Sequence, residues 1–242
     1  MSGLAGRRAL LASGLAAAVF AASGLPVAAA RRGGVLRVAI APDRVAAVVA
    51  RATGGALTEV ASDGTLGPGL VTGWEPVSGA RVWDLRVRDR AEEVVLALGA
   101  LGEAALVAPL RVRLALDAED ADLPLRLQAL VVPGAGLYAE ARRGDGRVTL
   151  RRVASHWKDG RAGWFDEVEL LARDPAGARL SALRSGLVEA ASGLGGHAAG
   201  MLRAGGEHGL ADRPDGVEAV SLRIAAPVGM DDAGFVERWS LA

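Results

Sequence analysis

Few side chains in this sequence are spaced for acid–base or metal chemistry. The histidines are His156, His197 and His208, and neither an H-x-x-x-H spacing nor a pair of carboxylates on one predicted helix accompanies them. A metal site formed by His197, Glu207 and His208 is one interpretation of this region. Histidines isolated in Gly-rich segments are more often ordinary loop side chains, so we expect no metal ion.

An acidic cluster is the second candidate for metal binding, at Asp117, Glu119, Asp120 and Asp122. A calcium-binding loop of about 12 residues needs a central glycine and a bidentate acid at its end. Neither is present, and Pro124 and Leu125 follow the cluster instead. The cluster is therefore interpreted as a solvent-exposed turn.

Nucleophiles and phosphate-binding loops have no recognisable motif either. Ser181, Ser185 and Ser192 lie outside any G-x-S-x-G sequence, so no hydrolase site can be assigned. The paired glycines, such as Gly33–Gly34, match neither the G-x-G-x-x-G nor the Walker A order, and we interpret them as flexible joints. We therefore expect a protein that is not an enzyme and has no cofactor.

The composition is that of a globular protein. Hydrophobic side chains make up 51% of the 242 residues, enough for one large domain or two small ones. The 28 basic and 28 acidic residues balance, whereas a nucleic acid or an anionic membrane requires a concentrated basic excess. The absence of cysteine excludes disulfide bonds, thiolate chemistry and a lipidated N-terminal cysteine.

Residues 1–30 have the three-part layout of a signal peptide. Arg7 and Arg8 precede an apolar run from Ala9 to Ala22, which is short for a membrane span. The paired arginines resemble a twin-arginine (Tat) signal, although the usual flanking Ser and Lys are missing. An ordinary Sec signal and a retained membrane anchor are the alternatives.

Small side chains end this N-terminal segment. A signal peptidase needs small residues at its two recognition positions, so Ala28 and Ala30 are the expected cleavage determinants. The mature domain is then residues 31–242, and we expect it to be exported, soluble and not lipidated.

The stretch from Val148 to Ala191 has the clearest secondary-structure pattern. Alternating side chains predict a strand at 148–153, and a Gly-containing loop leads to a second strand at 165–171. A helix follows over 174–185, and a return strand is expected at 187–191.

The ends of this helix carry their own signals. Asp174 is a suitable N-cap, Pro175 suits the first helical position, and Gly186 is free to adopt positive φ after the last turn. The face predicted to be buried holds Ala176, Leu180 and Leu183.

Weaker patterns predict the remaining elements. Asp63–Gly64 marks a turn between strands, and Trp74 and Trp83 are expected in the core of one sheet. Further strands are predicted at 35–40, 82–87, 109–116 and 217–225, and helices at 45–49, at 94–101 and around Phe235 to Trp239. We expect a single mixed sheet to contain 35–40, 82–87, 148–153 and 165–171.

In order, these segments resemble the family 5 extracellular solute-binding proteins, the receptors of peptide and nickel ABC importers. The opening Gly33–Ala39 is similar to that family's G-G-x-L-R-V-A. Later positions in step with the family are Trp157, Lys158, Gly160, Arg161, Phe165, Asp166, Glu167, Val168, Asp174, Pro175, Arg179, Ala182, Leu183, Ser185, Gly186, Val188 and Ala190. The sequence departs from it at Ala154, Ser155 and His156, where the family usually has Pro, Asp and Tyr.

The resemblance implies an α/β fold, a periplasmic-binding-protein-like lobe with a mixed sheet and flanking helices. Family members are considerably longer, because a second lobe is inserted beyond the position of Ala191. Residues 31–242 leave no room for that insertion, so we expect an incomplete domain reduced to mostly one lobe.

The resemblance also implies a function. The protein would be a periplasmic receptor that delivers a peptide or similar small solute to an ABC permease in the inner membrane, after export by the Tat machinery. The family's cleft implies ligand contacts at Ala41 and Pro42, and at Gly136 and Tyr138. The alternatives are a degenerate paralogue that acts as a non-transport interaction protein, and a Tyr138 that only packs on the sheet.

The export signal gives a first prediction. Replacing both Arg7 and Arg8 by Lys keeps the charge but removes the guanidinium pair that the Tat receptor reads, so we expect export to stop. Intact-mass measurement of the periplasmic fraction checks this and should show the parent chain cut after Ala30. Unchanged export of the Lys variant would assign the signal to the Sec route.

Overall fold

A computed structural model of the protein describes residues 33–60, 65–159, 162–163, 165–205, 208–213 and 216–221. The predicted export and cleavage residues Arg7, Arg8, Ala28 and Ala30 lie outside this range, as does the helix predicted around Phe235 and Trp239. Those expectations therefore stay predictions.

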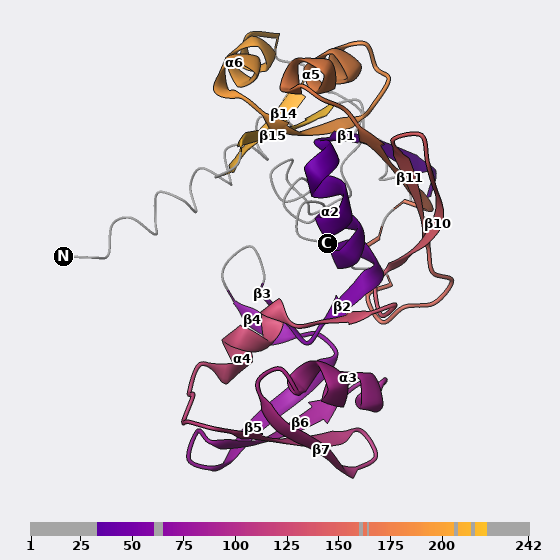
Figure 1. Cartoon of the computed structure of the whole chain (residues 1–242). Coiled ribbons are helices and arrows are strands. Elements are labelled where there is room, and N and C mark those ends of the chain that lie inside the picture. Colours follow the sequence, from indigo (N-terminus) through magenta and orange to yellow (C-terminus); the bar gives the residue numbers. More distant parts are fainter. Residues whose placement is uncertain are drawn as a thin grey trace, which may run out of the picture.

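The larger of two units is built on a seven-stranded sheet in the order β10-β11-β12-β1-β13-β15-β14 (Figure 1). Strand β1 (Val35–Ile40) is central and runs parallel to both β12 (Glu167–Ala172) and β13 (Ala190–Leu194). The antiparallel strands are β10 (Tyr138–Gly144), β11 (Arg147–Arg152), β14 (His208–Arg213) and β15 (Gly216–Ser221).

Helices cover both faces of this sheet. Alternation along β1 sends Leu36 and Ile40 towards α2 (Val45–Thr53), which the short η1 (Pro42–Arg44) precedes. Ala39 belongs to the cluster on the opposite face, beneath α5 (Ala176–Arg184) and α6 (Gly196–Gly205). The predicted α/β fold with a mixed sheet and flanking helices is confirmed.

The smaller unit, residues 57–130, has a sheet of its own. Four antiparallel strands follow the order β5-β6-β8-β7: β5 (Val71–Ser78), β6 (Val82–Val87), β8 (Arg111–Leu116) and β7 (Gly102–Ala108). The prediction that 82–87 joins the sheet of 35–40 is wrong. Strand β6 is paired on both sides, with β5 and with β8, so it has no free side for a strand of the larger unit.

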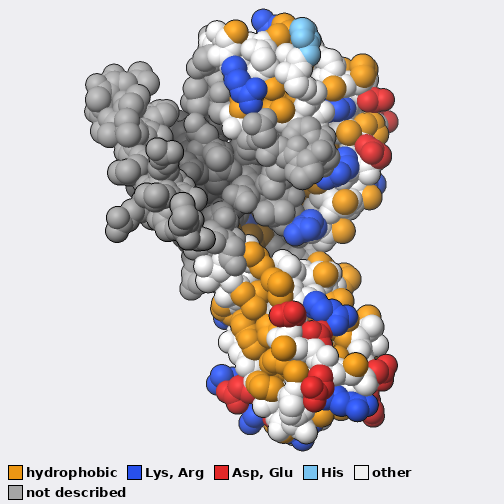
Figure 2. All heavy atoms as spheres, turned by 90° about the vertical axis from the view of Figure 1, so that its left-hand side faces the viewer, with side chains coloured by type: hydrophobic (Ala, Val, Ile, Leu, Met, Phe, Trp, Pro, Cys, Tyr) orange, Lys and Arg blue, Asp and Glu red, His pale blue; other side chains and the backbone are white. Residues whose placement is uncertain are grey.

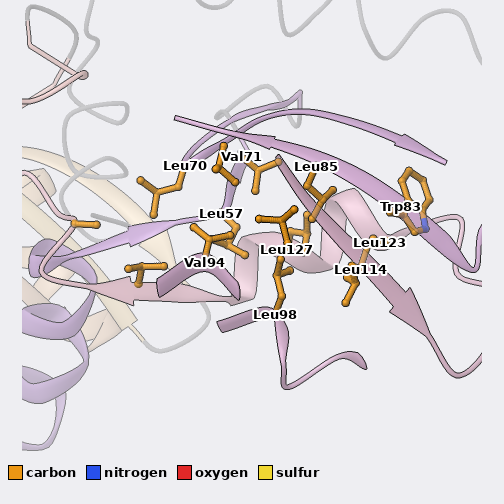
Figure 3. Packing of buried hydrophobic residues seen from close by; sticks show 14 of the residues in the cluster. Leu57, Leu70, Val71, Trp83, Leu85, Val94, Leu98, Leu114, Leu123 and Leu127 are labelled. Carbon is orange, nitrogen blue, oxygen red and sulfur yellow. The ribbon is translucent and has the colours of Figure 1, made fainter. Parts of the chain in front are cut away.

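One face of the four-stranded sheet is closed by short helices. They are α3 (Ala91–Leu98), α4 (Leu123–Arg126) and η2 (Leu127–Ala129), and the hairpin of β3 (Thr58–Val60) and β4 (Leu66–Pro68) lies beside them. Leu85, Leu98, Leu114 and Leu127 meet in this core (Figure 3). Trp83 is buried and Trp74 packs against the same cluster, as predicted for the two tryptophans.

A two-stranded ribbon joins the units. Strand β2 (Gly54–Ala56) leaves the larger unit directly after α2, and β9 (Val131–Pro133) returns to it beside β2 in antiparallel register. A Cβ atom on Gly54 would lie 2.2 Å from the Val131 side chain, so the ribbon is too close for any residue but glycine there.

The helix predicted over 174–185 is present, with a different start. Pro175 occupies the N-cap position of α5 instead of Asp174, and no side chain caps the helix. The Asp174 carboxylate is instead 3.7 Å from the guanidinium of Arg179 and is largely exposed. Gly186 has φ 73°, as predicted for the residue that ends the helix.

The return strand predicted at 187–191 begins three residues later, at Ala190. The backbone N–H groups of Leu187 and Val188 both donate to the Ala182 carbonyl, which extends the turn at the end of α5. The strand predicted at 217–225 is β15, described up to Ser221, whereas β14 had no clear signal in its Gly-rich sequence.

Truncating Leu183 measures how much the α5 face contributes to stability. Leu183 is 3% exposed and packs with Leu171 and Val188, so Leu183→Ala should reduce the free energy of unfolding by about 2–5 kcal/mol. Leu187→Ala, at a residue that is 50% exposed, is the matched control and should cost less than about 0.5 kcal/mol. Urea unfolding of both variants provides the comparison; equal losses would contradict the packing of α5.

Candidate functional site

Two of the four predicted ligand residues lie at the carboxyl end of the central strand. Ala41 is half-buried and Pro42 is exposed, directly after β1. The Arg173 N–H donates to the Ile40 carbonyl at 2.8 Å, so the carboxyl ends of β1 and β12 lie together. Open α/β sheets bind ligands at this edge. The Ala41–Pro42 turn is also the most exposed part of the four-residue set, so it is the best candidate for a ligand contact.

Gly136 lies at the other end of α2. Its N–H donates to the Thr53 carbonyl at 3.0 Å, and a Cβ atom there would lie 2.3 Å from the Ala52 carbonyl oxygen. Helix α2 has nine residues and is therefore about 14 Å long, which separates Gly136 from the Ala41–Pro42 turn. Close backbone packing accounts for the glycine.

Tyr138 begins β10 inside the core between α2 and the sheet. The side chain is 3% exposed, and its hydroxyl donates to the Phe165 carbonyl at 3.1 Å. Burial raises the pKa of the phenol to about 12. In this arrangement Tyr138 fastens β10 to the segment that leads into β12, and any contact with a ligand stays a proposal.

Arg179 of α5 stabilises the same carboxyl edge through hydrogen bonds to backbone carbonyls. This side chain of α5 is 5% exposed, and its guanidinium donates to the carbonyls of Ser192 (3.0 Å), Arg173 (2.6 Å) and Gly193 (2.9 Å). These carbonyls belong to the ends of β12 and β13, so one cation holds two strand ends and a helix together. Each guanidinium nitrogen donates to a backbone carbonyl, and Asp174 lies nearby, so we assign Arg179 a structural role.

The signal for Arg179 was present in the sequence. Arg179 shares the buried face of α5 with Ala182 and Leu183, at spacings of three and four residues. A charged side chain on an apolar helix face needs internal partners, because burying an unpaired charge is costly.

A polar hollow of about 480 Å³ opens at the amino end of β12. It is lined by Arg151, Arg152, Val153, Ala154, Asp159, Asp166 and Glu167. The charged side chains are already matched: Arg151 donates to Glu167 at 2.8 Å, Arg152 pairs with Asp159, and Asp166 accepts the Gly34 N–H at 2.9 Å. A ligand there would have to displace these pairs, so the carboxyl edge is the better candidate.

The loop from His156 to Asp159 reaches across to the smaller unit. The Arg88 guanidinium carbon is 4.5 Å from the centroid of the Trp157 ring, and the Lys158 ammonium is 5.0 Å from it. Lys158 also pairs with Glu59. These contacts connect the loop between β11 and β12 to β3 and to Arg88, the residue after β6, so the loop is a strut between the two units.

His156 contributes to the strut as a neutral side chain. Its Nδ1 accepts the Lys158 N–H at 3.1 Å, which leaves Nε2 to donate to the Ala135 carbonyl at 3.2 Å. Burial lowers the pKa of this imidazole, consistent with the neutral form. The residue that replaces the family's usual Tyr therefore has a structural role.

The other sequence-derived candidates stay apart. His197 is exposed on α6, whereas the side chains of Glu207 and His208 lie outside the described residues. Within the described ranges no three histidine, aspartate or glutamate side chains come together to hold a metal ion. No described helix has the length and apolarity to cross a bilayer.

Tyr138 gives a spectroscopic prediction, because it is the only tyrosine in the chain. A phenol whose pKa is about 12 when folded and about 10 when unfolded stabilises the fold fully below pH 10, and this contribution is lost as the pH rises towards 12. Tyrosinate absorbance should titrate near pH 12 in the native protein and near pH 10 in urea. Tyr138→Phe removes the signal. A native midpoint near 10 would mean that the hydroxyl faces solvent.

Similarity to known proteins is found in structure and not in sequence. No protein-family model matches the chain, and no curated protein is similar to it. A Helicobacter pylori periplasmic binding protein, DppA in complex with the peptide STSA, superposes with a TM-score of 0.64 at 15% identity, over 75% of this chain and 51% of its own.

Two further solved structures share the arrangement. The oligopeptide-binding protein AppA from Bacillus subtilis, in complex with a nonapeptide, gives a TM-score of 0.64 at 11% identity, over 75% of this chain and 48% of its own. NikZ from Campylobacter jejuni, in complex with Ni(L-His), gives 0.62 at 14% identity, over 73% and 46%. The chain thus spans about half the length of these proteins and has their periplasmic-binding-protein fold.

Proposed function

We propose that this protein is the solute-binding component of an ABC importer and that its ligand is a peptide or similar small solute. The shared fold supports this: the neighbours are binding proteins whose bound molecules are peptides or a nickel–histidine complex. We infer binding without catalysis, in keeping with a sequence that has no recognisable nucleophile or acid–base pair.

The ligand site that we propose is the carboxyl edge of the larger sheet. Ala41 and Pro42 provide surface next to the end of β1, and Arg179 keeps the ends of β12 and β13 in place beside them. Gly136 and Tyr138 lie at the opposite, amino end of the sheet, where Tyr138 pairs with Arg152, so they support the proposed site only by fixing α2 and β10. Backbone groups at such an edge can bind a peptide main chain without reading its side chains.

One wall gives weak binding. A peptide on an open surface keeps part of its backbone in water, yet it still loses translational and rotational freedom. Receptors that close two lobes around a ligand avoid this loss of contact. We therefore propose a dissociation constant weaker than about 100 μM for the chain by itself.

The proposed location is the periplasm. The charged start, apolar run and small-residue end of residues 1–30 support export through the Tat route, without lipidation because the chain has no cysteine. The proposed partner after ligand loading is an ABC permease of the inner membrane.

Calorimetry separates this function from the alternative of a paralogue that acts only as an interaction protein. Titrating the mature protein with a mixed peptide pool should give a weak, saturable heat in the range of about 100 μM to 1 mM. Pro42→Arg, at an exposed position, should weaken the binding several-fold by placing a long side chain on the edge. Pro68→Arg, at an exposed residue of the smaller unit, is the control and should leave it unchanged.

The outcomes are distinct. No heat at any concentration would support the interaction-protein alternative. A sub-micromolar complex would instead overturn the proposal of a single-walled site. Equal effects of the two proline variants would move the ligand away from the Ala41–Pro42 turn.

A further inference from the structure

The smaller unit has an open sheet edge that nothing described so far uses. Strand β7 ends the order β5-β6-β8-β7, and no other described strand pairs with its outer side. Figure 1 shows β7 in the unit remote from the seven-stranded sheet. Unpaired N–H and C=O groups along such an edge are a template for another strand.

The edge strand itself exposes large hydrophobic side chains. Among the described residues, six of the ten exposed large hydrophobic side chains belong to the smaller unit, and Figure 2 shows hydrophobic side chains gathered on one face of that unit. In β7 itself Leu106 is 45% and Val107 is 47% exposed, and Glu103 is the only charged residue of the strand.

Two other described edge strands, β5 and β10, carry features that discourage pairing. Strand β5 contains Pro76, which lacks an N–H, and its register shifts twice. Strand β10 has a register shift next to Glu140 and bears Arg142 and Arg143. Strand β7 also has a register shift, after Leu106, but it pairs regularly with β8 from Gly102 to Leu106 and contains neither proline nor a basic residue.

The β7 sequence is complementary to itself. Antiparallel pairing about a two-fold axis at Ala104 places Gly102 opposite Leu106 of a second copy, and Glu103 opposite Ala105. Gly102, Ala104 and Leu106 lie opposite the buried Leu116, Leu114 and Val112 of β8, so these three share the core face. Each Leu106 would therefore cover a glycine of the other copy, and the two Glu103 carboxylates would not meet.

We propose that β7 is a dimerisation edge, at which two copies of this chain join their four-stranded sheets into one continuous eight-stranded sheet. Five residue pairs bury less than the roughly 1,200 Å² of a stable interface, so the dimer is weak and depends on concentration. This edge is separate from the proposed ligand site, because that site is in the larger unit.

Introducing a charge at Ala105 tests the proposed register of the dimer. Ala105→Glu places a carboxylate opposite Glu103 of the other copy, twice in each dimer. In the monomer the new carboxylate lies opposite Arg113 on β8, so the fold should be retained. The double variant Glu103→Lys/Ala105→Glu exchanges repulsion for two Lys–Glu pairs. Val77→Glu, at a residue that is 53% exposed on β5, is the matched control.

Sedimentation velocity of the mature chain, from about 1 to 500 μM, should show a monomer–dimer equilibrium. We expect the dissociation constant to rise at least tenfold in Ala105→Glu, to return towards the parent value in the double variant and to stay unchanged in Val77→Glu, with circular dichroism confirming the fold of each. A parent that stays monomeric at 500 μM would overturn the proposal. So would association that Ala105→Glu leaves intact, because the contact would then lie elsewhere.

Discussion

Strand β1 is held on both sides by strands that come far later in the chain, and the larger unit depends on this pairing. Asp166 accepts the Gly34 N–H across 132 residues of sequence, and Glu189 accepts the Arg37 N–H across 152. Such closures cost chain entropy before any contact is gained. Backbone hydrogen bonds between the strands and buried apolar side chains on both faces of the sheet offset this entropy cost. Single substitutions at the surface do not remove these contacts.

Glycine and one aromatic loop make the connection between the two units stiff. The backbone of α2 meets the backbone of Gly136 with no space for a side chain, and Gly54 and Gly55 allow β2 the same closeness to its neighbours. The strut at Trp157 adds a second contact, so the smaller unit is fastened at a ribbon and at a loop. Two separate attachments restrict hinge motion more than either does alone.

Local patterns in the sequence predicted most elements, and non-local pairing accounts for the main errors. The alternation at 35–40 and 148–153 and the helix ending at Gly186 all have a local physical cause, and they are present in the structure. Which strands share a sheet depends on pairing between distant segments, and the alternation of side chains along β6 gives no information on its pairing partners. For this reason residues 82–87 were predicted in the wrong sheet.

The candidate site was predicted by resemblance, and only part of it is exposed. Ala41 and Pro42 lie at the edge where α/β sheets bind ligands, whereas Gly136 and Tyr138 are buried. Burial cannot be read from a motif, because the same tyrosine suits a cleft or a core. Arg179 shows the reverse case, in which a motif residue with a charge has an entirely structural task.

The β2–β9 ribbon bears on how such a chain can be altered during evolution. Ala56 and Val131 are register partners on neighbouring strands, so the two ends of the smaller unit lie about 5 Å apart. The segment between them has a separate hydrophobic cluster, which Val132 of β9 and Ala135 complete. In genetic terms the segment is a cassette: one deletion that joins the ribbon through a short turn would remove it while leaving every strand of the larger sheet in sequence.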